Sequence, residues 1–312
     1  MSTVDQSGGA ANASDRDKGA SGDGGSSDIP YDSGMTALLA DLHLHSHHSD
    51  GVLDPAALMR LVASRGVDLA ALTDHDTTAG CAAAAAACAD AGIRFISGVE
   101  VSAGWQGQSL HVLGLGVAAD TPRLVAHLEG LRAQRRARLL EIGERLEKRA
   151  GLPGRELAAA VCAATAVPTR LHLARALVAS GRVRNEAEAF TRLLGRGLPG
   201  HVPMEWPALE EAVGALRAAG ATVVLAHPHR YRLSNGALRR LVDEFRAAGG
   251  DGLEVSVAGM SPRDLDRLAT LARSSKLKAS TGSDFHDPAV PWNTPGRFAK
   301  LPADLEPVAA CL

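Results

Sequence analysis

Short groups of His, Asp and Glu residues recur at the ends of apolar runs in this 312-residue chain. The first group, residues 41–51, follows the apolar run 37–40, a pattern typical of a buried strand that ends in a turn. His43 and His45 lie two residues apart, so on a strand they project to the same side. Two such imidazoles can hold one metal ion, and Asp50 in the following turn could add an oxygen ligand. A polar, His-rich loop without a metal would also explain this group.

Five further groups of the same kind argue against chance. They are Asp74 with His75 after 67–72, Glu100 after 93–96, His111 within 110–113, His227 with His229 after 222–225, and Asp284 with His286 after 278–282. The alternation of such runs with helix patterns, punctuated by Gly, is typical of β-α-β units. It predicts parallel strands that carry ligands at their carboxyl ends, where barrel enzymes place their chemistry. We therefore expect strands at 93–99 and 109–117 to present Glu100 and His111 in this way.

The series resembles the PHP (polymerase and histidinol phosphatase) superfamily of metal-dependent phosphoesterases, over about residues 37–300. The matching motifs are His43-x-His45, Ser49-Asp50-Gly51, Thr73-Asp74-His75, Gly98-Val99-Glu100, His111, His227-Pro228 and Asp284-x-His286. The resemblance implies an α/β fold, namely a PHP-type distorted (β/α)7 barrel with an all-helical insertion subdomain. It also implies hydrolysis of phosphate esters with bound metal ions.

The order of the predicted elements divides the chain into four parts. We expect a disordered tail at 1–35, the first part of the barrel at 36–118, a helical insertion at 119–202 and the second part of the barrel at 203–312. The tail is rich in Gly, Ser and Asp and has almost nothing to bury. Aromatic residues make up only 3% of the chain, so the core must be built from Ala, Leu and Val, which suits a parallel sheet covered by Ala-rich helices. The insertion would cover the site as a lid.

The insertion carries a positive charge that the whole chain does not have. Residues 119–200 hold 15 Lys and Arg against 8 Asp and Glu, an excess of 7, which leaves −9 for the rest of a chain whose net charge is −2. Within it, a long helix from Pro122 to Gly151 is predicted, and Arg135 and Arg138 fall on its apolar face. Arginines are rarely buried without a partner. Either they form ion pairs with acids across the fold, or this face lines a cavity that binds an anion.

The family resemblance also assigns the metal ligands. One site would use His43, His45, Glu100 and Asp284; a second would share Glu100 and take His111 and His227; a third would use Asp50, His75 and His286. Imidazoles mixed with carboxylates suit Mn²⁺, Fe²⁺ or Zn²⁺ better than Ca²⁺ or Mg²⁺. Nine ligands imply two or three divalent ions, and Mn²⁺ is our prediction. Such ions lower the pKa of water and clamp phosphoryl oxygens, so no nucleophilic Ser or Cys is needed. The acid for the leaving oxygen could be Asp76 or a water.

Within the superfamily, several stretches resemble the bacterial branch of 3′,5′-nucleoside bisphosphate phosphatases that also act as 5′-to-3′ exoribonucleases. They are Gln134–Arg138, Pro168–Arg175, Gly195-Arg196-Gly197, Ala226–Ser234 and Gly282–His286. The branch implies hydrolysis at the 3′ side of a nucleotide whose 5′-phosphate is held by Arg135, Arg138 and Arg170, with Arg230 as a further phosphate contact. Where the branch continues Gly-Arg-Gly with Lys-Pro, this chain has Leu198-Pro199. Either a cationic substrate contact is missing here, or His201 replaces part of it.

Three other functions fit parts of the pattern. A phosphatase of small molecules, of the histidinol-phosphatase type, shares the metal motifs but does not explain the basic insertion. A PHP module serving a polymerase would be expected beside polymerase domains, and an RNA-binding protein without turnover would lack metal ligands.

The four cysteines are scattered, and neither a signal pattern nor a membrane-spanning apolar run is present. We therefore expect a cytoplasmic enzyme, with a nucleotide bisphosphate or 5′-phosphorylated RNA as substrate and no predicted protein partner.

Overall fold

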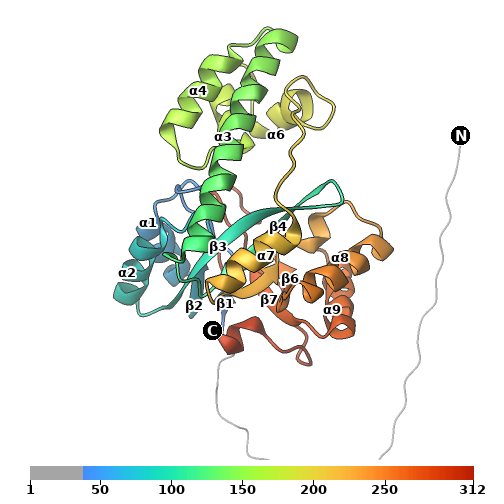
Figure 1. The fold of residues 1–312 in the computed structure, drawn as a ribbon. Helices are drawn as coiled ribbons and strands as arrows, with labels where there is room; N and C mark the ends of the chain where they lie inside the picture. Colours follow the sequence, from blue (N-terminus) through green and yellow to red (C-terminus); the bar gives the residue numbers. More distant parts are fainter. Residues whose placement is uncertain (1–37) are drawn as a thin grey trace, which may run out of the picture. The chain divides into compact units, whose positions relative to one another are not determined.

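Seven strands form one sheet in chain order in the computed structural model, which describes residues 38–312 (Figure 1). The tail predicted at 1–35 lies outside the described residues. The two outer strands approach each other: the Leu42 N–H donates to the Thr281 carbonyl at 3.1 Å, and Leu44 and Phe285 form a parallel bridge. The sheet is therefore a nearly closed barrel, and the predicted fold is confirmed. The strands are β1 (Ala40–Asp41), β2 (Leu69–Leu72), β3 (Arg94–Trp105), β4 (Gln108–Leu115), β5 (Thr222–Leu225), β6 (Gly252–Val257) and β7 (Lys278–Gly282).

One strand runs against the predicted direction. β4 pairs antiparallel with both β3 and β5, while all other neighbours are parallel. The cause is the two-residue turn Gln106-Gly107, whose φ angles of 47° and 74° suit a tight hairpin and leave no room for a crossover helix. The parallel strand predicted at 109–117 was therefore wrong. The parallel strands finish at one end of the barrel, and the reversed β4 begins there. His111, near the beginning of β4, therefore still lies at that end.

Five helices pack around the barrel. Their bounds are α1 (Pro55–Ser64), α2 (Cys81–Ala91), α7 (Leu209–Ala218), α8 (Asn235–Ala247) and α9 (Pro262–Ser275). In α1, the Asp54 side chain accepts the Ala57 N–H and Pro55 lies in the first turn, two features typical of the beginning of a helix. No helix within residues 38–312 is long and apolar enough to cross a membrane.

The predicted insertion contains four helices and the π-helical turn Phe190–Leu194. We call these elements together the helical block. The four helices are α3 (Pro122–Ala150), α4 (Gly154–Ala164), α5 (Arg170–Ala179) and α6 (Glu186–Ala189). Helix α3 extends from the barrel to α4 and α6 (Figure 1), and its side chains take part in two separate cores. Near its beginning, Leu124, Leu128 and Leu131 pack in the barrel core, whereas Leu139, Ile142 and Leu146 pack against α4 and α5. Residues 38–312 form one compact unit, so the boundaries at 118 and 202 stay a prediction.

The contact between α3 and α4 allows a test of the helical block. A Cβ atom on Gly143 would lie 2.5 Å from the Gly154 carbonyl oxygen and 2.7 Å from the Ala158 Cβ. We expect Gly143→Val to lower the free energy of unfolding by about 1–3 kcal/mol, because the two helices cannot separate without losing their core. Gly130 on the same helix has no atom within 4 Å of such a Cβ, so Gly130→Ala should raise stability by up to about 1 kcal/mol.

Urea unfolding followed by circular dichroism measures both changes. Equal stability of Gly143→Val and the wild type would show that α3 and α4 do not pack this closely.

Candidate metal centre

All nine predicted ligands lie at one end of the barrel. Seven are buried, and His111 and His286 are half-buried. The ligand atoms of all but His227 form three overlapping groups, and within each group every atom lies within 4.8 Å of the others. The groups are His43, His45, Glu100 and Asp284; His45, Asp50, His75 and His286; and His75, Glu100 and His111.

The carboxylate of Glu100 lies at the centre of this cluster. Its Oε2 is 3.3 Å from Nε2 of both His43 and His45, and 2.9 Å from Nδ1 of His75. Its Oε1 is 2.9 Å from Nδ1 of His111 and 2.9 Å from Nε2 of His227. One carboxylate therefore contacts five imidazoles, which come from both the parallel strands and the reversed β4.

The observed groups agree with the predicted ligand sets in part. The first predicted set is found as one group, and the third is joined by His45. The second predicted set was Glu100, His111 and His227. His227 does contact Glu100, but the observed group around Glu100 and His111 contains His75 and not His227. The nine residues are brought together, and their division among individual ions stays a prediction.

Unpaired buried atoms make this cluster suited to metal ions. Within residues 38–312, Nε2 of His43, Nε2 of His45 and Oε2 of Glu100 are buried without a hydrogen-bond partner, as are Asp50 Oδ1 and His75 Nδ1. Leaving a buried polar atom unsatisfied costs about 1–3 kcal/mol. Five such atoms in one place, all on imidazoles and carboxylates, fit a first-row divalent ion of the Mn²⁺, Fe²⁺ or Zn²⁺ type.

The charges of the cluster shift its pKa values strongly. Burial would raise the pKa of Glu100, but the charges of His75, His111 and His43 hold it well below its usual range. Burial would lower the pKa of His45, but the carboxylates of Asp284 and Glu100, 3.2 Å and 3.3 Å from its Nε2, outweigh burial and raise the pKa to about 10. At neutral pH and without metal, His45 is therefore protonated. A metal ion must displace that proton to use the imidazole as a ligand.

Two buried carboxylates that we did not predict as site residues support the ligands. Asp74 accepts hydrogen bonds from the Ser46 N–H at 2.7 Å and from the Ser46 and Ser49 hydroxyls at 2.6 Å each, which fixes the loop that carries Asp50. It belongs to the Thr73-Asp74-His75 motif and was visible there. Glu254 in β6 contacts His43 Nδ1 at 2.9 Å and accepts the His227 N–H. Its only sequence signal is a carboxylate inside an apolar strand, where Glu is rare.

Asp76, which we predicted as a possible general acid for the leaving oxygen, is instead held in hydrogen bonds within the fold. Its side chain is fully buried, and it does not line the pocket beside the cluster. Oδ1 accepts the Ser102 N–H at 2.8 Å, while Oδ2 accepts Arg135 Nε at 2.6 Å and the Ser102 hydroxyl at 3.1 Å. Both oxygens are occupied, so the geometry does not support a proton-donating role.

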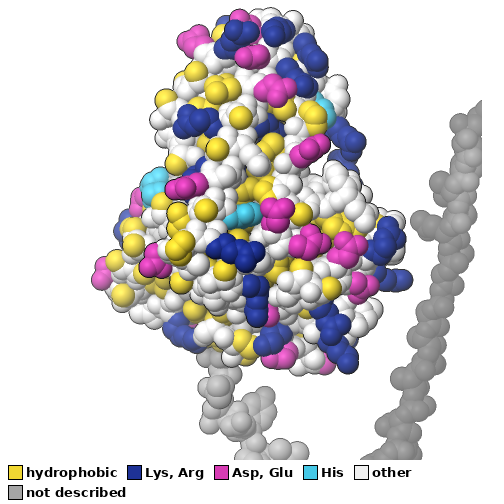
Figure 2. Space-filling view, in the orientation of Figure 1, with side chains coloured by type: hydrophobic (Ala, Val, Ile, Leu, Met, Phe, Trp, Pro, Cys, Tyr) yellow, Lys and Arg dark blue, Asp and Glu magenta, His cyan; other side chains and the backbone are white. Residues whose placement is uncertain are grey.

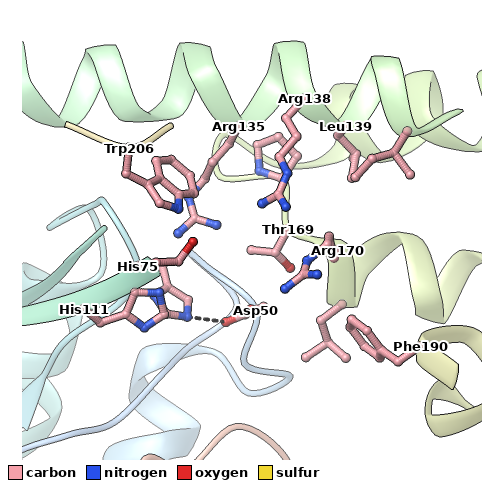
Figure 3. Close-up of a pocket in the computed structure, with 14 residues that line it drawn as sticks. Asp50, His75, His111, Arg135, Arg138, Leu139, Thr169, Arg170, Phe190 and Trp206 are labelled. Atoms are coloured by element: carbon pink, nitrogen blue, oxygen red, sulfur yellow. Dashed lines mark ion pairs between the residues drawn. The ribbon is translucent and has the colours of Figure 1, made fainter. Parts of the chain in front are cut away.

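A pocket next to the cluster is shared between the barrel and the helical block (Figure 3). Asp50, His75 and His111 line it on the barrel side. The guanidinium groups of Arg135 and Arg138 enter it from α3 and that of Arg170 from α5 (Figure 3). Apolar side chains complete the wall, among them Leu139, Ile142, Phe190 and Trp206.

Two of these three arginines have no carboxylate partner among the described residues. Arg138 donates only to the Val202 carbonyl, and Arg170 lies over the Phe190 ring at 5.7 Å. Burial lowers the pKa of Arg138 to about 10, with repulsion from Arg170 and Arg135 adding to the shift. Burial also lowers the pKa of Arg170, again with a contribution from Arg135. Such a group of half-buried like charges favours binding of an anion.

The exposed basic side chains of the helical block are different in kind. Lys and Arg lie among Asp and Glu on the face shown in Figure 2. Many form ion pairs along or between helices, such as Arg155 with Glu147 and Arg192 with Glu188. Both alternatives that we considered for the arginines of α3 therefore occur: Arg135 pairs with Asp76, while Arg138 faces the pocket without an acid.

The other two predicted phosphate contacts lie elsewhere. Arg230 forms an ion pair with Asp284, one of the predicted ligands, and does not line the pocket. His201 is also absent from the pocket wall, and its carbonyl accepts a hydrogen bond from Arg145. Of the five predicted phosphate-binding residues, Arg135, Arg138 and Arg170 are thus brought to one place, and His201 and Arg230 are not.

A barrel that gathers imidazoles and carboxylates at one end defines a metal-dependent hydrolase. The sequence pattern of the PHP domain matches residues 41–142. The chain belongs to the PHP family, as its motifs predict.

Relatives support this membership over most of the chain. A 5′-3′ exoribonuclease from Haemophilus influenzae is 40% identical over 268 residues, which cover 86% of this chain and 97% of the relative. A 3′,5′-nucleoside bisphosphate phosphatase from Chromobacterium violaceum is 41% identical over 269 residues, 86% of this chain and 94% of the relative. The solved structure of an amidohydrolase from C. violaceum, with bound sulfate and no metal, has a TM-score of 0.81 at 40% identity and covers 87% of this chain and 94% of its own.

The raised pKa of His45 leads to a prediction on metal binding. Since the metal-free imidazole is protonated up to about pH 10, protons and metal ions compete for it, and Mn²⁺ affinity should rise with pH. We expect the apparent dissociation constant to fall about tenfold per pH unit between pH 6 and 8 for each proton released. Isothermal titration of the chelator-treated protein, in two buffers of different ionisation enthalpy, measures the affinity and the proton count. An affinity independent of pH would contradict the protonated state of His45.

Proposed function

We propose that this protein removes the 3′-phosphate of 3′,5′-nucleoside bisphosphates and releases 5′-mononucleotides from 5′-phosphorylated RNA. The proposal includes two or three divalent ions, with Mn²⁺ as the best match to the ligands. The observation that carries it is the arginine pocket next to the ligand cluster. Relatives named as a bisphosphate phosphatase and as an exoribonuclease support the choice of substrate.

The two neighbouring sites suit a substrate with two phosphates. Asp50, His75 and His111 belong to the cluster and also line the pocket, so an anion held by Arg138 and Arg170 would lie beside the predicted ligands. A nucleotide could place its 5′-phosphate on the arginines and its 3′-phosphate at the cluster. A phosphate monoester of the histidinol phosphate type would leave the half-buried Arg138 and Arg170 without a counter-charge, which is why it is the second choice.

The described residues can bind and orient such a substrate. Thr169 and Arg170 lie at the beginning of α5, where the helix dipole favours an anion, and the guanidiniums supply paired N–H donors. The apolar side chains of Leu139, Ile142 and Phe190 reduce access of water around these donors. When bound, divalent ions would supply an acidified water and neutralise charge on the phosphoryl oxygens. With the 5′-phosphate on the arginines, the bond placed at the cluster is the 3′-phosphate ester of a bisphosphate or the first internucleotide linkage of an RNA.

Substrates that differ at their 5′ end test whether the pocket arginines bind a 5′-phosphate. Loss of one buried, charge-assisted contact typically costs about 2–5 kcal/mol. Arg138→Ala and Arg170→Ala should therefore each lower kcat/KM on 5′-phosphorylated substrates by at least about 30-fold. Arg136→Ala is the matched control, because Arg136 is exposed on the same helix and does not line the pocket.

The measurement compares adenosine 3′,5′-bisphosphate, RNA with a 5′-phosphate, RNA with a 5′-hydroxyl and an aryl phosphate, each with Mn²⁺. The wild type should prefer the 5′-phosphate, and the two variants should lose this preference. Equal wild-type rates on both RNA ends, or equal losses on the aryl phosphate, would mean that the arginines are structural and that a small-molecule phosphatase is the better assignment.

The ligand cluster is tested by removing His43. His43→Ala should bind fewer metal ions and show no measurable hydrolysis, because its Nε2 faces both Glu100 and Asp284. His47→Ala is the control, since His47 is exposed and belongs to none of the three groups. Metal content after chelation and Mn²⁺ reconstitution is measured together with turnover. Turnover near that of the wild type in His43→Ala would exclude this cluster as the reaction centre.

A further inference from the structure

Glu254 occupies a position where a carboxylate is costly. Its side chain is 0% exposed inside β6, and it forms no ion pair with Lys or Arg among residues 38–312. The pairing of β6 with β7 is irregular at this point: Glu254 faces Ser280 and Ser256 faces Thr281, so Val255 is an extra residue. Such an irregularity changes the direction of side chains and is common beside active sites.

The two oxygens of Glu254 contact two different predicted metal ligands. Oε1 lies 2.9 Å from Nδ1 of His43, and Oε2 accepts the backbone N–H of His227 at 2.5 Å. His43 follows β1 and His227 follows β5, so one carboxylate connects ligands from two strands that are far apart in the sequence. Both oxygens act as acceptors.

The contact with His43 decides which ring nitrogen is available to a metal ion. If Nδ1 donates its proton to Glu254, the lone pair of the neutral imidazole is on Nε2. That nitrogen is buried without a hydrogen-bond partner and lies 3.3 Å from both Glu100 Oε2 and Asp284 Oδ1. Glu254 therefore selects the tautomer that points its free nitrogen at the cluster.

The contact with His227 holds a backbone conformation that side chains rarely adopt. His227 has φ of 30° and ψ of 53°, in the left-handed region, which costs a residue with a Cβ about 1–2 kcal/mol. This conformation brings its Nε2 to 2.9 Å from Glu100 Oε1. By accepting the N–H of His227, Glu254 stabilises the strained residue in the position where its ring reaches the cluster.

We propose that Glu254 is a positioning residue of the metal centre, which fixes the tautomer of His43 and the backbone of His227 at the same time. The inference rests on the proposed metal centre and is independent of the proposed substrate. The role requires an acceptor on both ends of the side chain. Glutamine has the same size but only one acceptor end, because its NH₂ group can only donate. Glu254→Gln can therefore accept from the His43 Nδ1–H or from the His227 N–H, but not from both, and its NH₂ group placed against His43 Nδ1 would favour the wrong tautomer.

The experiment measures metal binding and the state of His43. After removal of metal by a chelator, Glu254→Gln should bind Mn²⁺ about 10- to 100-fold more weakly than the wild type. Asp251→Asn is the matched control: Asp251 directly precedes β6, accepts the Val223 N–H and belongs to none of the three groups, so its variant should bind Mn²⁺ like the wild type. Far-ultraviolet circular dichroism checks that both variants are folded.

A second readout needs no variant. In the Zn²⁺-loaded wild type, ¹H–¹⁵N correlation spectra of the histidine rings should show His43 with metal on Nε2 and a slowly exchanging proton on Nδ1. Metal on Nδ1 of His43, or unchanged Mn²⁺ affinity in Glu254→Gln, would overturn the proposal. A wild type that binds neither Mn²⁺ nor Zn²⁺ would instead overturn the metal centre, and a failure of the substrate assignment would change none of these results.

Discussion

A single buried carboxylate, Glu100, connects the parts of this protein. Its two oxygens contact five imidazoles that come from strand ends between residues 43 and 227. An ionised carboxylate inside a protein is unfavourable unless positive charge or a metal surrounds it. The barrel resolves this by ending its parallel strands at the same place and by reversing β4, so that β1, β2, β4 and β5 each bring an imidazole to the same carboxylate.

Charges around this centre are arranged in layers. Directly outside the ligands, Glu254, Asp74 and Asp76 use both carboxylate oxygens to hold histidines, loops or an arginine. Further out, the arginines of α3 and α5 face the ligands across the pocket. The helical block is also tied to the ligand loop itself, because Arg175 donates to the Asp50 carbonyl at 2.8 Å. Positions of the metal ligands and of the arginines are therefore not independent of each other.

Much of this architecture was predictable, and the exceptions have physical reasons. The alternation of strands and helices follows from apolar periodicity and end signals, which depend on nearby residues, and the resemblance to the PHP superfamily implied the barrel. The direction of β4 was missed because Gln106-Gly107 is a weak turn signal between two strands that otherwise resemble β-α-β units. Glu254 was missed because its partners, His43 and His227, are remote in sequence. The position of Arg135 on the apolar face of its helix predicted that it could pair with an acid. Which acid it pairs with, Asp76, depends on the three-dimensional fold and could not be predicted.

The division of α3 between two cores has a geometric consequence. Leu131 is the last residue of the helix in the barrel core, and Leu139 is the first in the core of the helical block. An α-helix turns about 100° and rises about 1.5 Å with every residue. One residue more or less between these leucines would rotate the helical block by more than a quarter of a turn around the helix axis, and it would change the direction of the arginines relative to the barrel. The number of residues in this stretch therefore sets the angle between the helical block and the barrel, whatever side chains it carries.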